Sequence, residues 1–291
     1  MGKLSFSLIL LFSISYLFAQ TPENVSSNPD EKSSWDYSVD IPWRNSRPIV
    51  EFSYGYNTPK HTKFQDEFTS IGAIEIKLGY SRVEPYRKKF LELDEDFLFA
   101  SYSSRDVTDF DNNDTDKVYT DYLRFGMGHR GGYGYDLAPL SLLPYHHTQF
   151  SFTRVKSERL DSLSKEDNDI LDRYEGSYRF SNATEGGIKF SISNSVGITA
   201  SYEAAVIYPR IVFFPWIGGI IVQNIAVGIV SHFGKEIVHT GHWLGPIMYA
   251  LLKNGAAYGV YLGMKERQYW PFNSETPLTH ETFKLGFSIT F

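Results

Sequence analysis

The last nine residues of the chain alternate strictly between apolar and polar or small side chains. The apolar members occupy every second position: Phe283, Leu285, Phe287, Ile289 and Phe291. Successive side chains of a β-strand point to opposite faces, so a period of two predicts a strand with one apolar face. The other face carries Lys284. Any fold that this chain adopts must therefore place an apolar strand face against lipid or against a core.

Seven earlier segments show the same alternation. Their apolar rows lie within residues 50–56, 74–80, 97–103, 123–127, 150–152, 188–192 and 196–202. The charged residues of the opposite faces are Glu51, Glu75, Lys77, Arg124, Glu185, Lys189 and Glu203. Charges are costly on a lipid face and tolerated in a polar lumen. Their mixed signs predict a lumen sealed by ion pairs rather than an ion filter of one sign.

These rows predict an all-β transmembrane fold, an antiparallel up-and-down β-barrel of about eight strands. A soluble β-sandwich would alternate in the same way, so the period alone does not decide between them. With both ends in the periplasm, the short turn at Asn194 and Ser195 is periplasmic, and residues 106–116 and 157–182 lie outside the cell. Residues 82–96 and 130–145 are expected to be long periplasmic linkers.

The composition excludes several classes of protein. The chain has 291 residues, a net charge of -6, no cysteine, 16% aromatic residues and a mean hydropathy of -0.28. A multi-span helical membrane protein is more hydrophobic, and a disordered chain has fewer aromatic residues. Without cysteine there are no disulfides or thiolate metal sites. No basic stripe is present, so nucleic acid is not an expected partner.

The N-terminus has the pattern of a cleavable export signal over residues 1–19. Lys3 provides the positive charge, residues 4–18 form an apolar run and Ala19 is the small residue before the cut. The run is shorter than the roughly 20 apolar residues of a spanning helix. Residues 20–47 are rich in Ser, Asn, Pro and Glu and predict a flexible periplasmic lead-in.

The final strand resembles the C-terminal β-signal of Gram-negative outer-membrane β-barrel proteins. The resemblance covers the last nine residues and rests on Gly286, Phe287, Ile289 and Phe291. It implies an outer-membrane location, contact with outer-membrane lipids and recognition by the barrel-assembly machinery. On this basis residues 48–208 form strands one to seven, and residues 282–291 form the closing strand.

Between these strands, residues 209–281 change period and predict a helical hairpin. Residues 216–233 and 244–264 are apolar almost all round, and Pro215 and Pro246 suit first turns of helices. Gly255, Gly259 and Gly263 form a small-residue stripe that would let another helix approach closely. Alternatively, residues 217–222 and 225–230 are two more strands, which gives a ten-stranded barrel. The hairpin would cap a mouth, flank the barrel or plug a wider one.

Candidate metal ligands occur in two settings. Asp109, Asp111 and Asn113 follow the start of a calcium-binding loop, but Asp114 stands where that loop has glycine and Thr120 where it has glutamate. The histidine pairs at 146–147 and 239–242 lack accompanying carboxylates at metal-site spacing. An ordinary solvated loop and structural histidines explain these residues better. No cofactor is expected.

Catalysis is the alternative to a structural, assembly or small-solute transport role. Ser151, His147 and Glu185, or Glu203 in its place, could form a serine, histidine and acid set for a lipid hydrolase or acyltransferase. The chain has no GlyXxxSerXxxGly elbow, so these remain weak candidates. A periplasmic binding protein is a third class, which requires the terminal strand pattern to be coincidental.

Overall fold

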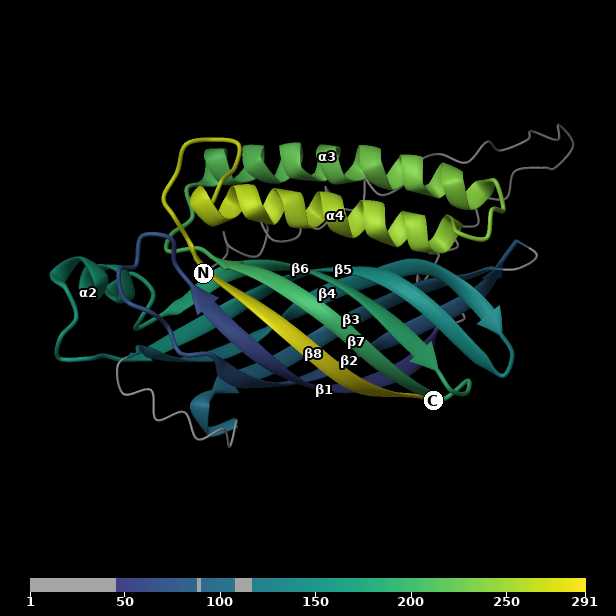
Figure 1. Ribbon diagram of the computed structural model, residues 1–291, viewed down its shortest axis with the longest axis horizontal. Coiled ribbons are helices and arrows are strands. Elements are labelled where there is room, and N and C mark those ends of the chain that lie inside the picture. Colours follow the sequence, from purple (N-terminus) through teal and green to yellow (C-terminus); the bar gives the residue numbers. More distant parts are fainter. Residues whose placement is uncertain (1–45, 88–89, 108–116) are drawn as a thin grey trace, which may run out of the picture. The chain divides into compact units, whose positions relative to one another are not determined.

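Eight antiparallel strands form a closed barrel in which each strand pairs with its neighbours in chain order (Figure 1). The computed structural model describes residues 46–87, 90–107 and 117–291. The strands are β1 Arg47–Lys60, β2 Ile71–Tyr86, β3 Phe90–Ser104, β4 Tyr119–Leu137, β5 Leu140–Glu158, β6 Tyr178–Ser191, β7 Val196–Ile207 and β8 Leu278–Thr290. The prediction of an eight-stranded up-and-down barrel is confirmed. The closing strand begins at Leu278 rather than at residue 282.

The register of the pairs fixes the size and tilt of the barrel. A path across the strands that starts at Ile49 and follows paired residues returns to β1 at Pro59, ten residues further along. A shear of this size on eight strands tilts them by roughly 35–45° from the barrel axis. Such a barrel has an interior that its own side chains fill.

Along the strands, apolar side chains lie on the outer surface and polar side chains lie in the interior, the reverse of their distribution in a soluble protein. The outward side chains of Phe52, Leu98 and Phe283 are 54%, 63% and 53% exposed, whereas the inward Glu51 and Lys77 are each 1% exposed. The predicted alternation is confirmed along all eight strands. An apolar exterior around a charged interior is what a lipid-embedded barrel requires. It is the reverse of what a soluble binding protein or sandwich would carry.

Connections at the two ends of the barrel differ in length. At one end, here called the turn end, residues 87–89, 138–139 and 192–195 join the strands. The expectation of long linkers at 82–96 and 130–145 is therefore wrong. β2 continues to Tyr86 and β3 begins at Phe90, and only two residues separate β4 from β5. The prediction failed because polar or glycine residues such as Arg82, Asp94, Asp96 and Gly131 interrupt the outward apolar rows while the strand pairing continues.

The opposite end, here called the loop end, carries a small apolar cap. A short 3-10 helix, Arg105–Val107, follows β3. The connection of β5 to β6 contains α2, Lys165–Asp172, whose N-terminus is capped by Ser164. Ile170 of α2 packs with residues from five strands in a buried cluster that also contains Tyr174. These strand residues are Ile71, Tyr122, Val155, Ile207 and Leu278. Their packing closes the barrel at the loop end.

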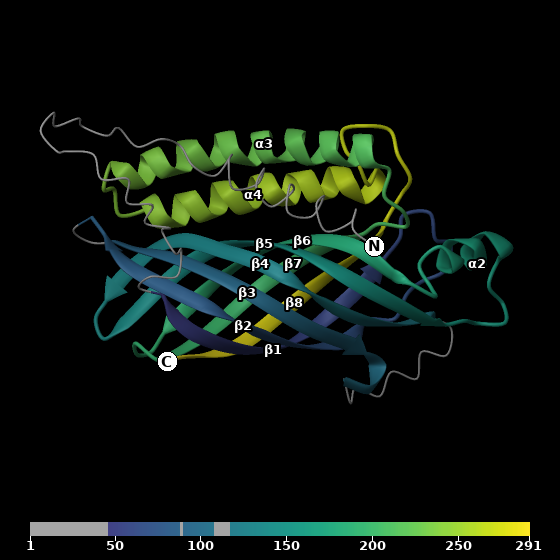
Figure 2. The same ribbon diagram turned by 180° about the vertical axis from the view of Figure 1, so that it is seen from behind.

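The connection of β7 to β8 forms two long antiparallel helices, α3 Phe213–His239 and α4 Gly245–Glu266. Both views show them side by side along the outside of the barrel (Figures 1 and 2). The predicted helical hairpin is confirmed, with Pro215 and Pro246 in the first turns. The ten-stranded alternative is wrong, because residues 217–230 lie in α3. The Ile and Val residues there favour strands by propensity alone, and in the fold they belong to a long apolar helix that packs against α4.

The hairpin has the length and apolar character of a membrane-spanning element. At 27 and 22 residues, α3 and α4 extend about 40 Å and about 33 Å, against a bilayer core of about 30 Å. Among the described residues, α3 is the helix long and apolar enough to cross a membrane by itself, with a mean hydropathy of 1.8. Most of the α3 surface is exposed, and the helix lies outside the barrel. The hairpin therefore flanks the wall rather than plugging the lumen (Figures 1 and 2).

Contact between the two helices does not use the predicted glycine stripe. A Cβ added at Gly255 or Gly259 would meet nothing within 4 Å, so α3 does not approach these two glycines, and close packing of another helix there stays a prediction. Gly263 faces the ring of Trp270 in the connection that follows α4. The close approach occurs instead near the turn between the helices, where Gly234 lies against Tyr249. A stripe of glycines predicts a helix face to which another helix can pack closely. The sequence does not show which face of α4 contacts α3.

Candidate functional site

Charged side chains fill the lumen and form one continuous network. Its members in the described chain are Glu51, Glu75, Lys77, Glu95, Arg124, Arg130, Glu185, Lys189, Glu203 and Lys284. Each has 6% or less of its surface exposed. They come from all eight strands except β5, which adds Gln149 and Tyr145 as hydrogen-bond donors. The predicted lumen of mixed, paired charges is confirmed.

Arg130 on β4 is the most heavily bonded cation of this network. Its two terminal nitrogens donate to the two carboxylate oxygens of Glu51, each at 2.8 Å, and one of them also donates to Glu95 at 2.9 Å. The guanidinium lies over the rings of Tyr145 and Phe97, at 4.4 and 4.9 Å from their centroids. A planar, always charged guanidinium suits both contacts, and lysine could not replace it.

Lys284 on the closing strand is the second junction. Its ammonium lies 2.5 Å from Glu185, 2.9 Å from Glu203 and 3.0 Å from Glu75. Lys77 then connects Glu75 and Glu185 to Glu51, and so to Arg130. Charges on strands far apart in the sequence are thereby held within one low-dielectric interior. Removing a single partner of a buried pair typically costs about 3–5 kcal/mol, because the remaining charge is left uncompensated.

A second polar contact joins α4 to the outer wall. The Asn254 side chain donates to the backbone oxygen of Tyr145 at 3.0 Å and contacts Nδ1 of His146 at 2.9 Å through its own oxygen. The neighbouring wall residue is Gly186, where an added Cβ would lie 2.8 Å from the Asn254 amide. Glycine at this position therefore lets the amide reach the strand backbone.

Further along α4, a carboxylate on the outer wall is paired with residues of the helix and of β1. Glu281 accepts from Lys60 at 2.7 Å and from the Tyr261 hydroxyl at 3.2 Å, and Lys265 lies 3.7 Å away. A charge that would otherwise face lipid at this position is covered and paired. The hairpin therefore completes the wall where the wall itself is polar.

The predicted catalytic residues do not assemble. His147 and Glu185 do approach, with Nδ1 3.6 Å from the carboxylate, but both are completely buried in the lumen. Ser151 instead contacts the Ser181 hydroxyl at 2.6 Å and lies four residues from His147 on β5, about 13 Å along an extended strand. Ser151 is therefore out of reach of the His147 imidazole.

The predicted metal candidates are also dispersed. Asp109, Asp111 and Asn113 lie outside the described residues. His146 points out to Asn254 whereas His147 points into the lumen, so adjacent histidines on a strand cannot chelate one ion. His239 lies 3.7 Å from Glu236 of its own helix, and His242 stacks on Trp243.

The terminal row lies where the β-signal pattern places it. Phe287, Ile289 and Phe291 all point outward, with 45%, 36% and 66% of their surfaces exposed. Gly286 points inward, where an added Cβ would lie 2.4 Å from Thr199 Oγ1 and 2.7 Å from Ser53 Oγ. The glycine is thus needed for the first and last strands to close against each other. Recognition of this segment by assembly machinery stays a prediction.

Sequence reasoning missed three groups of residues. Glu95 and Arg130 of the lumen, and Asp94 and Asp96 on the outer face, lie in segments expected to be linkers, and His129 directly precedes the second of these segments. Asn254 was overlooked as one polar residue in an apolar run. A signal for Glu95 was available, since Leu93, Glu95 and Phe97 continue the inward row of β3 by period two.

The closed eight-stranded wall, apolar outside and charged inside, defines an outer-membrane type of β-barrel. Among solved structures, the chain is similar to Neisserial surface protein A, NspA, with 10% identity over 84% of this chain and 97% of that chain, and a TM-score of 0.36. It is also similar to Ail, the attachment invasion locus protein of Yersinia pestis, with 9% identity over 85% of this chain and 99% of that chain, and a TM-score of 0.31. No family model and no curated protein matches the chain.

Proposed function

We propose that the protein is a non-conducting outer-membrane barrel that acts as a scaffold for a membrane-embedded helical hairpin. The observation that carries this proposal is the lumen network, in which buried carboxylates and cations pair across the interior from strand to strand. An eight-stranded barrel leaves room for its own side chains rather than for a channel. A structural role therefore fits the lumen better than small-solute transport.

The hairpin supports the scaffold half of the proposal. It occupies more than fifty residues of the β7 to β8 connection, far more than closing a barrel requires. It is held at the turn end by an apolar cluster of Phe90, Tyr133, Val238 and Tyr249, and midway by Asn254. We infer that the turn end faces the periplasm, so that α3 and α4 cross the membrane outward to inward and back.

Planar-bilayer conductance of the purified protein tests the proposal. The wild type is expected to give no stepwise current, because the paired side chains fill the lumen. The double variant Glu51→Ala and Arg130→Ala removes one anion and one cation together and is expected to admit ions. A double variant at the exposed pair, Arg210→Ala and Glu275→Ala, is the matched control and should stay silent. Regular open steps in the wild type would overturn the proposal.

A further inference from the structure

An unusual polar cluster lies on the outer face of the barrel, where polar side chains interrupt the apolar rows of β3 and β4. The outward row of β3 runs from Tyr102 to Leu98 and then changes to Asp96 and Asp94. The outward row of β4 changes in the same way, because the residue after Met127 in the row is His129, which is paired with Asp96. These side chains therefore lie at the border of the lipid-facing surface, toward the turn end.

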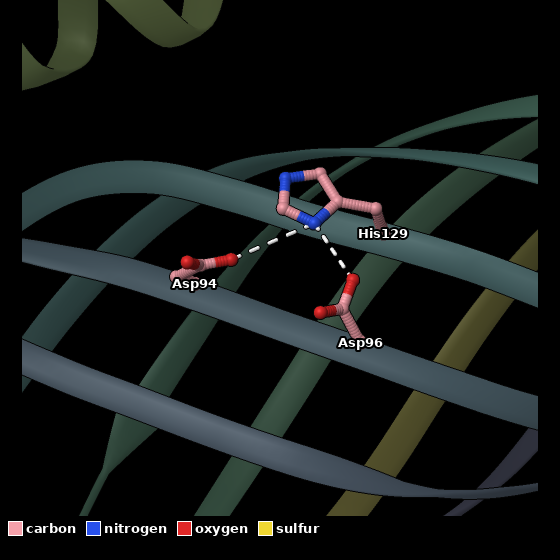
Figure 3. Close-up of side chains that lie close together, drawn as sticks. All are labelled: Asp94, Asp96 and His129. Atoms are coloured by element: carbon pink, nitrogen blue, oxygen red, sulfur yellow. Dashed lines mark hydrogen bonds and ion pairs between the residues drawn. The ribbon is translucent and has the colours of Figure 1, made fainter. Parts of the chain in front are cut away.

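The three side chains converge on one point (Figure 3). The Nδ1 atom of His129 lies 3.0 Å from Oδ1 of Asp96 and 3.5 Å from Oδ1 of Asp94. All three atoms lie within 4.8 Å of one another. The side chains are 57%, 52% and 34% exposed, in the order His129, Asp96 and Asp94, so an ion could reach them.

Neighbouring residues hold this arrangement and leave space beside it. Arg82 of β2 donates to Oδ2 of Asp94 at 2.6 Å, which turns the other oxygen, Oδ1, toward His129. Gly131, the next outward residue of β4, lacks a side chain, and an added Cβ would lie 3.4 Å from Nε2 of His129. Hydrogen bonds from a second residue to a ligating carboxylate are a regular feature of metal sites.

The distances match a tetrahedral transition-metal site. Zinc binds imidazole nitrogen and carboxylate oxygen at about 2.0–2.2 Å, so neighbouring ligand atoms of a tetrahedron lie about 3.3–3.6 Å apart. The separations from Nδ1 of His129 lie close to this spacing. Calcium and magnesium prefer six or more oxygen ligands, which a nitrogen and two carboxylates do not provide.

We propose that Asp94, Asp96 and His129 bind one divalent transition-metal ion of the zinc type at the border of the lipid-facing wall. Asp94 and Asp96 each provide one carboxylate oxygen, and His129 provides Nδ1 after losing its proton. Arg82 positions Asp94 and does not touch the ion. The fourth ligand is a water molecule. Three protein ligands with one open position is the arrangement of zinc sites that exchange a ligand.

Calorimetric titration of zinc chloride into the tag-free, detergent-solubilised full chain tests the site. One ion per chain is expected to bind, and His129→Ala and Asp96→Asn are each expected to abolish saturable binding. Arg82→Gln should weaken affinity about 10-fold, the effect of losing an outer hydrogen bond to a ligand. His232→Ala, an exposed histidine on α3, is the matched control and should bind as the wild type does.

Cobalt substitution gives a measurement that does not depend on variants. Tetrahedral cobalt bound to one nitrogen and three oxygens gives intense visible bands, and these are expected with the wild type. Weak octahedral bands, absent binding, or zinc binding that persists in both His129→Ala and Asp96→Asn would overturn the proposal. In that case the cluster is only a set of ion pairs. Heat-modifiable migration on gels checks that each variant remains a folded barrel.

Discussion

The lumen and the outer wall beneath α4 both place polar side chains away from water, but they partner them differently. In the lumen, five carboxylates and five cations of the described strands pair with one another. Beneath α4, a neutral amide, Asn254, reaches a backbone oxygen and a histidine, and small residues such as Gly186 give it room. Ion pairs connect the strands in the lumen, whereas close packing and hydrogen bonds of a neutral amide attach the hairpin to the wall.

This difference indicates that the lumen network stabilises the barrel, whereas the contacts beneath α4 position the hairpin. The lumen network connects strands from β1 to β8, so its loss affects barrel closure as a whole. The contact of the hairpin lies mainly on β4 to β7, on one side of the barrel, and makes few polar bonds. We therefore expect substitutions in the lumen to lower the stability of the whole barrel and substitutions beneath α4 to loosen only the hairpin.

The largest effect is expected from Arg130→Met. It leaves Glu51 and Glu95 without their shared cation, so the free energy of unfolding should fall by about 3–5 kcal/mol. Urea titration of the barrel in lipid vesicles measures this change. Arg210→Met breaks an exposed pair with Glu275 and should cost less than about 1 kcal/mol. Equal effects of the two substitutions would contradict a lumen held by buried charge.

Gly186→Leu should displace the hairpin without opening the barrel. Its side chain would overlap the Asn254 amide, an overpacking that costs about 1–3 kcal/mol. Because the chain has no cysteine, cysteines introduced at Val238 and Phe90 report the contact of the hairpin by cross-linking with a short thiol reagent. The yield should fall in Gly186→Leu while heat-modifiable migration is unchanged. Unchanged cross-linking would argue against the tight fit.

A smaller effect is expected from Asn254→Leu, which removes the two hydrogen bonds to the wall. The loss should be about 1 kcal/mol, typical of an interhelical or helix-to-wall bond in lipid. Asn224→Leu is the control, because Asn224 is exposed on α3 and donates to Ile220 of its own helix. Urea titration should separate the two variants. A larger loss in Asn224→Leu would mean that the hairpin has a further polar partner.

The smallest effect is local to the cap at the loop end. Burial lowers the pKa of His61 to about 4, from an ordinary value of 6.5. The neutral form is favoured in the folded cap, so this stability is complete above pH 6.5 and is lost as the pH falls from about 6.5 toward 4. The protection of the Phe64 amide, which donates to the His61 carbonyl, from hydrogen exchange should fall in that window when it is measured relative to the intrinsic rate at each pH. His61→Gln should remove the dependence.

Much of the barrel could be predicted from the sequence because one rule, apolar out and polar in, governs every strand in the lipid. It gave the faces of Phe52 and Glu51, and the row that ends at Phe291. The rule failed where strands leave the apolar belt, as at Asp94 and His129, because polar outward residues there resemble a linker. Pairing across strands, which brings Asp96 beside His129, depends on register and cannot be counted along the chain.

The helical hairpin makes the two sides of the barrel wall different. α4 covers β4, β5, β6 and β7, whereas β8, β1 and β2 present their apolar rows uncovered, as with Phe52 and Phe283. A round barrel offers much the same surface to any neighbour in the plane of the membrane. This one offers strands on one side and a helical surface with open glycines on the other, so its neighbours meet different surfaces according to the direction of approach.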